Sequence, residues 1–230
     1  MKNIKCRLST ILVLFSLVGT GCSVINHSKN LLPENQRIAS NITIQKNTIE
    51  QVEIINQNHP HFLNEDLSLD QGNWQRFSNL DSLNRVGEAN AMLHKSMMPT
   101  EERERLYIKP TGWKQKKMKN GDYLYNRCHL IGYQMTGENN NPKNLMTGTR
   151  SFNTPAMVEY ENQVAEYLRR TGNHVRYRVT PDFRENELVA RGVQIEAQSI
   201  EDNVISFNVY IHNIQEGYDI DYQTGNSKIK

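Results

Sequence analysis

Cysteine is scarce in this chain of 230 residues, which contains three: Cys6, Cys22 and Cys128. The first two fall in or next to the N-terminal apolar stretch described below, so Cys128 stands alone in the rest of the chain. A single cysteine cannot form an internal disulfide. The remaining residues are numerous enough for one domain of ordinary size, and its stability must come from a hydrophobic core.

Long apolar runs are also lacking. The run from Ile11 to Val18 is too short to span a bilayer as a mature helix. It follows three cations and leads through small residues to Cys22, an arrangement typical of a bacterial lipoprotein signal. We therefore expect residues 1–21 to be a signal peptide and Cys22 to carry lipid on the extracellular face of the membrane. Because Gly19 stands where leucine is usual, secretion after ordinary cleavage and an uncleaved anchor remain alternatives.

Neither sign of charge is in large excess, since the chain contains 27 Lys and Arg and 25 Asp and Glu. Residues 1–21 carry three cations and no acid, so the remainder has a formal charge of −1. Overall charge therefore does not indicate a nucleic-acid partner. Local charge does, because Arg103 to Lys143 holds nine cations and three acids. A solvated lysine-rich turn at residues 114–119 is the simpler reading of part of this excess.

Polar residues dominate positions 22–65, which are rich in Asn, Gln, Ser and Ile. This composition predicts a tether, and we place the folded domain at residues 66–230. His59 and His61 flank a proline in the tether. Two nearby histidines beside a proline are more often part of a loop than of a metal site.

Alternating apolar residues predict strands in four places. In the segment 122–131 the alternation sends Arg127 and His129 to the same face. Residues 174–181, 187–199 and 204–214 alternate in the same way and should pair in an antiparallel sheet. Arg176 and Arg178 share one face of their strand, where they either extend a nucleic-acid groove or are simply exposed.

Helical patterns occur in two segments. Thr154 suits the cap of a helix that starts at Pro155 and stops at Gly172. The apolar spacing from Asn73 to Leu93 predicts a helical or turn-rich segment. Strands together with few helices indicate an α+β fold with a central antiparallel sheet and flanking helices.

The stretch from Tyr123 to Pro155 combines groups suited to phosphodiester hydrolysis. A strand ends in Arg127-Cys128-His129, an Asn-rich loop follows, and Asn153 lies at the mouth of the predicted helix. Imidazole can act as a base, an amide oxygen is a ligand that Mg²⁺ accepts, and arginine stabilises developing negative charge. These residues therefore indicate a one-metal phosphodiesterase.

This stretch, YLYNRCHLIGYQMTGENNNPKNLMTGTRSFNTP, resembles the DNA/RNA non-specific endonucleases of the ββα-metal class, of the bacterial DNA-entry nuclease and streptodornase type. Asn126 to His129 stands where the signature of that family is Asp-Arg-Gly-His. The resemblance extends over about residues 74–225, including LDSLNRVGEANAML, PTGW and DYQTG. It implies a ββα-metal (His-Me finger) motif within the α+β fold.

The resemblance also implies roles for individual residues. His129 would be the general base, and Asn153 would bind Mg²⁺, with Mn²⁺ as an alternative. Glu161 would hold the ion through a water molecule, although a solvated helix acid is the simpler reading. The expected reaction is hydrolysis of DNA, with RNA as an open second substrate, into 5′-phosphate products. No protein partner is implied.

The resemblance implies roles for three further residues. Arg127 and Arg85 would stabilise charge on the phosphate, although a surface arginine is the simpler reading of Arg85. Asn144 would hold the Asn-rich loop or form a hydrogen bond within the site. Asparagine is too common in this chain for Asn144 to be informative alone.

The chain departs from the family pattern at three positions. Asn126 replaces the signature Asp, Cys128 replaces Gly, and Ala165 stands where some relatives carry Arg. These departures bring the rate and the metal preference into question. A surface nucleic-acid-binding protein with a degenerate site is therefore one alternative.

A second alternative is a cysteine hydrolase that uses Cys128 with His129 or His174. Neighbouring residues on a strand point to opposite faces. Cys128 and His129 therefore cannot pair directly, which argues against this class of enzyme.

Overall fold

The computed structural model describes residues 50–230. The expected signal peptide and Cys22 lie outside this range. Within it, no helix has both the length and the apolar character needed to cross a membrane. The strands are β1 (Val52–Ile54), β2 (Trp74–Phe77), β3 (Ala89–Leu93), β4 (Tyr125–His129), β5 (Leu145–Thr149), β6 (Val175–Asp182), β7 (Gly192–Ser199), β8 (Ser206–His212), β9 (Tyr218–Ile220) and β10 (Ser227–Ile229). The helices and helical turns are η1 (Asn56–Asn58), η2 (Asn64–Leu67), η3 (Lys95–Met97), α2 (Tyr133–Thr136), η4 (Phe152–Met157) and α3 (Val158–Thr171).

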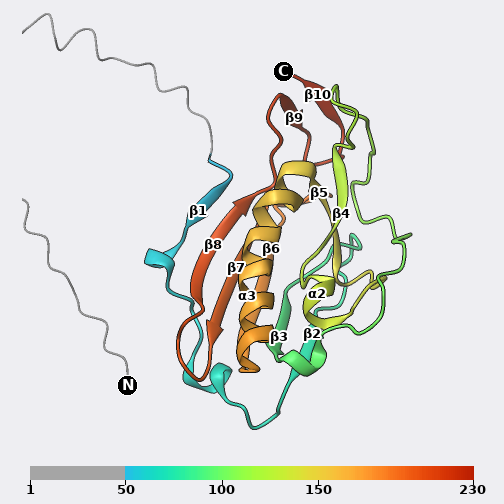
Figure 1. Cartoon of the computed structure of the whole chain (residues 1–230). Coiled ribbons are helices and arrows are strands. Elements are labelled where there is room, and N and C mark those ends of the chain that lie inside the picture. The colour runs from blue at the N-terminus through green and yellow to red at the C-terminus, as the bar shows by residue number, and fades with distance from the viewer. Residues whose placement is uncertain (1–49) are drawn as a thin grey trace, which may run out of the picture. The chain divides into compact units, whose positions relative to one another are not determined.

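Six strands form one sheet in the order β1-β8-β7-β6-β3-β2 (Figure 1). Every neighbouring pair is antiparallel, as predicted for the three C-terminal strands. Tyr177 pairs with Ala197, and Ile195 pairs with Val209. Along β6, β7 and β8 the side chains alternate between a buried face and a polar face of the sheet. This is why the alternating sequence pattern located these strands.

The sheet also includes residues from the segment expected to be a tether. Strand β1 pairs with β8, with Val52 opposite Ile211, and Val52 packs against the hydrophobic core. The Ile55 backbone N–H then donates to the Asn208 carbonyl. The folded part of the chain therefore begins before residue 66. Its edge strand is short and half-exposed, so its apolar signal in the sequence is weak.

The segment from Asn73 to Leu93 contains two strands, and the prediction of a helix there is wrong. Ala89, Ala91 and Leu93 are fully buried on one face of β3, which pairs with both β2 and β6. The residues between β2 and β3 form turns, which matches the second half of the prediction. Apolar spacing in a short segment does not separate a helix from two strands joined by a loop.

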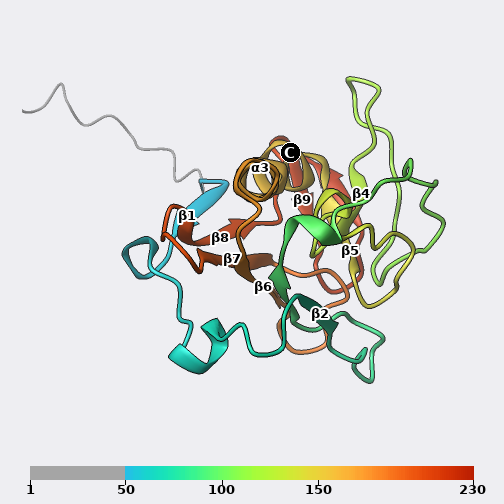
Figure 2. The same cartoon turned by 60° about the horizontal axis from the view of Figure 1, so that its bottom comes forward.

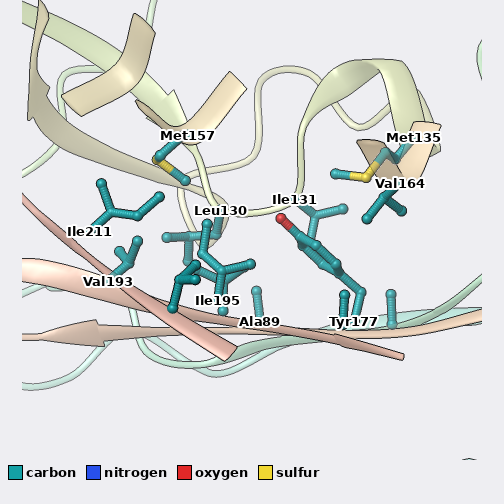
Figure 3. Packing of buried hydrophobic residues seen from close by; sticks show 14 of the residues in the cluster. Ala89, Leu130, Ile131, Met135, Met157, Val164, Tyr177, Val193, Ile195 and Ile211 are labelled. Carbon is teal, nitrogen blue, oxygen red and sulfur yellow. The ribbon is translucent and has the colours of Figure 1, made fainter. Parts of the chain in front are cut away.

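A second layer covers one face of the sheet. It consists of α3 and the hairpin of β4 and β5, as Figures 1 and 2 show. Figure 3 shows Val164 of α3 and Met157 of η4, the turn before it, packed over Tyr177 and Ile195 from the sheet. Cys128 of β4 and Met146 of β5 belong to the same cluster. The hairpin and the helix thus share one hydrophobic core, which fixes their positions relative to each other.

The opposite face of β6 is covered by the segment before β2. Arg176 is only 4% exposed, and its guanidinium lies 4.8 Å from the ring of Phe62 and 5.0 Å from that of Trp74. Arg178 is half-buried and forms an ion pair of 2.7 Å with Glu196. Plain exposure therefore describes neither arginine. Both are held by neighbouring side chains, and both line a pocket whose other walls include Asp66 and Glu88, so the groove alternative stays a prediction.

Helix α3 ends as expected and begins later than expected. Gly172 has a φ of 70°, and its N–H donates to the Leu168 carbonyl, which closes the helix with the left-handed residue that glycine favours. Thr154 is extended, with φ −142°, but its side chain caps neither η4 nor α3, whose capping residues are Ser151 and Met157. The wide turns of η4 then precede the regular helix, which starts at Val158.

Candidate active site

The hairpin places His129 at the end of β4. His129 pairs with Leu145 and Arg127 pairs with Thr147, so the two side chains share a face, as the alternation predicts. Cys128 lies on the other face and is fully buried. Burial raises the pKa of its thiol well above the usual value. A protonated, inaccessible thiol is not a nucleophile, which argues further against a cysteine hydrolase.

The imidazole of His129 is 6% exposed and held at both nitrogens. Nε2 lies 2.9 Å from the carbonyl oxygen of Asn139, which can only accept, so Nε2 carries the hydrogen. Nδ1 therefore presents its lone pair, 3.3 Å from a guanidinium nitrogen of Arg103. Burial is the main cause that lowers the pKa of His129 to about 4, and the charge of Arg103 lowers it further. A neutral ring with an unprotonated Nδ1 is the form that a base requires.

Asn144 holds the chain just after His129. Its side chain is fully buried, its Oδ1 accepts from the Ile131 N–H at 2.9 Å, and its Nδ2 donates to the Ile131 carbonyl at 3.0 Å. This double contact fixes the segment that leads from β4 into α2. The Asn144 side chain thus bonds to the segment after His129 rather than to the Asn-rich loop, and its role in the site stays a prediction.

Glu161 lies on the buried side of α3, in register with Val164, Ala165 and Leu168. The residue is 8% exposed, and its carboxyl group lies against Gly132. Burial raises the pKa of this carboxyl to about 7, against the opposing charge of Arg103. A charged residue in an apolar helix stripe is a sequence signal that could have identified Glu161 without any resemblance.

Gly132 explains how Glu161 reaches the hairpin. A Cβ at position 132 would lie 2.7 Å from Oε2 of Glu161, closer than real contacts allow. The carboxyl group of Glu161 therefore lies against the backbone three residues after His129, in space that glycine leaves open. His129 and Glu161 are thus brought to one region, in which Arg103 acts on the pKa of both.

Arg103 is the functional candidate that sequence reasoning missed. In the sequence Arg103 is only the first cation of a basic segment, yet in the structure its guanidinium contacts Nδ1 of His129 and lies 5.9 Å from the ring of Tyr133. It comes from an irregular segment between η3 and β4, where no periodic pattern marks a residue. The concentration of positive charge from Arg103 onwards was its one available signal.

The two arginines that were predicted lie in different surroundings. Arg127 donates from Nε to the Ile108 carbonyl, and its guanidinium lies 4.6 Å from the ring of Trp113. Arg85 bonds to Asp81 at 2.7 Å and to the carbonyls of Glu185 and Glu187. These contacts tie Arg85 to the loop between β6 and β7, and none of them is to another predicted site residue.

Asn153 offers one free oxygen. Its Nδ2 donates to Oγ1 of Thr154 at 3.1 Å, and its Oδ1 accepts no hydrogen bond from the described residues. Residues 50–230 contain no group of three or more His, Cys, Asp or Glu side chains that could hold a metal. A metal at Asn153 would therefore keep mostly water ligands, as Mg²⁺ does when the protein offers few.

The two departures in the signature affect the hairpin interior. Nδ2 of Asn126 is buried and has no hydrogen-bond partner among residues 50–230; an Asp at this position would lack this donor. A Cβ at Gly148 would lie 2.4 Å from Sγ of Cys128, so glycine at 148 leaves the space that Cys128 fills. The cysteine is thus accommodated across the hairpin, whereas Asn126 leaves one donor unsatisfied.

Comparison with known proteins decides the family. The family model for the DNA/RNA non-specific endonuclease matches residues 67–201, more than half of the chain. This chain belongs to the DNA/RNA non-specific endonuclease family. A deoxyribonuclease of Streptococcus dysgalactiae subsp. equisimilis is 30% identical over 115 residues, which cover 48% of this chain and 35% of that protein. The chain thus spans about a third of the length of this curated relative.

Two solved structures of nucleases have the same fold. NucA from Streptococcus agalactiae with a bound magnesium ion is 26% identical, with a TM-score of 0.70 over 80% of this chain and 90% of that one. Sda1 nuclease with a bound zinc ion is 27% identical, with a TM-score of 0.59 over 68% of this chain and 82% of that one. The α+β fold inferred from the sequence is therefore confirmed.

Proposed function

We propose that this protein is a magnesium-dependent endonuclease that hydrolyses DNA, with RNA as a second substrate, without sequence preference and with 5′-phosphate products. The observation that carries this proposal is the neutral, buried His129, which presents Nδ1 beside Arg103. Family membership and the nuclease structures with bound metal ions support it. Sequence indifference follows if contacts are made to phosphates rather than to base edges.

His129 would take the proton of the attacking water at Nδ1. The hydrogen bond from Nε2 to Asn139 keeps the ring in the required tautomer and orientation. When substrate binds, the Arg103 guanidinium would move from Nδ1 to the phosphate. There its charge would stabilise the additional negative charge of the transition state. Arg127 could add to this stabilisation from the same strand face, with Arg85 as the candidate assigned by resemblance alone.

Asn153 and Glu161 fit a divalent cation. Oδ1 of Asn153 is a hard oxygen without a hydrogen bond from the described residues, and the carboxyl group of Glu161 is buried. Asn153 would hold the ion directly and Glu161 would hold it through water, with Mn²⁺ as an alternative to Mg²⁺. A bound cation would polarise the scissile phosphate and neutralise part of its charge. Asn144 would keep the loop after His129 in place.

The first experiment is cleavage of plasmid DNA with Mg²⁺ and with EDTA, using wild-type protein, Asn153→Ala and the matched control Asn186→Ala. We expect cleavage only with Mg²⁺, loss of it in Asn153→Ala, and end-labelling that detects 5′-phosphates. Calorimetric titration with Mg²⁺ should show weaker binding to Asn153→Ala. Equal cleavage in EDTA, or unchanged metal binding by Asn153→Ala, would contradict the metal site.

A degenerate binding protein is the second candidate, favoured by the unsatisfied donor of Asn126. Salt-sensitive DNA binding by a wild-type protein that does not cleave with Mg²⁺ or Mn²⁺ would support it. Restored cleavage in Asn126→Asp would then identify the departure that removes activity.

Export and anchoring are a further part of the proposal. The N-terminal pattern supports lipidation at Cys22 and a place on the extracellular face of the membrane. Metabolic labelling with a fatty-acid analogue should mark the wild type and leave Cys22→Ser unmarked. Label in both proteins, or in neither, would contradict a lipid at this cysteine.

A further inference from the structure

Tyr107 presents its ring to solvent four residues after Arg103, in the same irregular segment. The residue is 71% exposed, compared with 51% for Tyr123 later in the same irregular segment. This segment, between η3 and β4, projects away from the sheet in Figure 2. A large exposed ring near a site for a polyanion calls for an explanation beyond packing.

The neighbours of Tyr107 alternate in exposure. Arg105, Tyr107 and Lys109 are exposed, and the intervening Leu106 and Ile108 are half-buried. Alternation of this kind is the pattern of an extended chain, which advances about 7 Å over two residues. Arg105, Tyr107 and Lys109 therefore form an outer strip in which one aromatic ring stands between two cations.

Hydrogen bonds fix the backbone of this outer strip. The side-chain amide of Asn140 accepts from the Tyr107 N–H at 3.1 Å and donates to the Arg105 carbonyl at 3.2 Å. Nε of Arg127 donates to the Ile108 carbonyl. The ring of Tyr107 is thus free, while the chain that carries it is held on both sides.

The loop that holds the outer strip also orients the base. Asn139 accepts from Nε2 of His129 through its carbonyl oxygen, at 2.9 Å, and donates from Nδ2 to the Glu104 carbonyl, at 3.0 Å. Asn140, the next residue, binds the backbone on both sides of Leu106. The outer strip and the base are therefore attached to consecutive residues of one loop.

We propose that the outer strip is a platform for single-stranded nucleic acid, on which Tyr107 stacks against one unpaired base while Arg105 and Lys109 contact flanking phosphates. Every base has a π face, so stacking tolerates any sequence, and the two cations make binding depend on salt. The faces of bases inside a duplex are already stacked, and the ring reaches them only after local opening. This inference rests on the proposed function and assigns it a preference for unpaired strands.

The test measures dissociation constants in EDTA by fluorescence anisotropy, with the purified protein. The probes are a single-stranded oligodeoxynucleotide, its abasic copy and the corresponding duplex. Tyr107→Ala should weaken binding of the intact single strand roughly 5- to 100-fold and change the other two by less than about twofold. Tyr107→Phe should bind as the wild type does, because it keeps the ring. Tyr123→Ala is the matched control and should show no such selectivity.

Several results would overturn the platform. One is equal affinity of the wild type for the intact and the abasic single strand. Another is a loss of affinity in Tyr107→Ala that is equal for these two probes. A third is a loss of affinity for the intact strand in Tyr123→Ala as large as that in Tyr107→Ala. Cleavage assays with Mg²⁺ separate this inference from the function on which it rests. A wild type that does not cleave contradicts the endonuclease alone, because binding is measured independently. If the wild type cleaves, and the ratio of its cleavage rates on single-stranded and duplex DNA is the same in Tyr107→Ala, the platform alone is contradicted.

Discussion

The hairpin of β4 and β5 differs from the irregular segment 101–110 that precedes it, although both contribute to the candidate site. The hairpin is held by backbone pairing and by burial, and it places His129 with 6% exposure. The segment is largely exposed and is held by the side-chain amides of Asn139 and Asn140. Burial thus places the base, whereas a few polar contacts place the charge and the ring that would meet the substrate.

The largest effect should come from the buried side of this comparison. His129→Ala removes the base and should lower the rate of DNA cleavage by roughly 100- to 10,000-fold. His174→Ala is the control, because His174 lies outside the site and bonds to Glu201 at 2.7 Å. Circular dichroism should show that both variants fold. A rate within tenfold of the wild type in His129→Ala would contradict its role.

Substitution of Arg103 tests the role of the exposed segment 101–110. Arg103→Ala should lower kcat/KM by about 100-fold, because one group that stabilises transition-state charge is lost, and Arg103→Lys should recover part of it. Arg184→Ala, an exposed arginine near Asp182, is the control. The melting temperature should stay close to that of the wild type in both variants. Faster cleavage by Arg103→Ala would instead mean that Arg103 blocks Nδ1.

The pH dependence of His129 protonation shows how much of its lowered pKa comes from burial and how much from the charge of Arg103. Its folded pKa of about 4 lies below the ordinary value of 6.5, so the unfolded state binds more protons between these values. As pH falls through this window, His129 should therefore cost up to about 3 kcal/mol of stability. Imidazole NMR titration should show protonation near pH 4 in the wild type and at higher pH in Arg103→Gln. An unshifted midpoint near 6.5 in the wild type would contradict the buried, neutral base.

The smallest effect should come from loosening the segment. Asn140→Ala removes the acceptor of the Tyr107 N–H and the donor to the Arg105 carbonyl, each worth about 1 kcal/mol or less at an exposed position. Hydrogen exchange of the Tyr107 amide should become faster, and KM should rise a few-fold with little change in kcat. Asn186→Ala is the control. Unchanged exchange at Tyr107 would show that Asn140 does not hold the segment.

Local patterns in the sequence predicted the elements that are held by burial. Alternation located β4 and placed Arg127 and His129 on one face, and it also located β6, β7 and β8. Gly172 marked the end of α3. These predictions succeeded because strand and helix periods reflect which side chains face the core. The same reasoning failed for β2 and β3, where spacing compatible with a helix belongs to two strands.

Contacts between distant residues could not be predicted in this way. Arg103 contacts a histidine 26 positions away, and Asn140 bonds to a backbone 35 positions away. Arg176 became buried because Phe62, from the segment called a tether, covers it. Such contacts leave no period in the sequence, since each depends on how loops pack after the sheet and helix have formed.

The sequence by itself therefore determined the α+β class, the strand that carries His129 and the helix that carries Glu161, because their apolar faces have to be buried. Only the tertiary structure decided that Arg103 lies at Nδ1 of His129 and that Asn140 fixes the backbone of Tyr107 while its ring stays exposed. It also decided the neutral state of His129, because the pKa of a side chain depends on the burial and charges that folding brings to it.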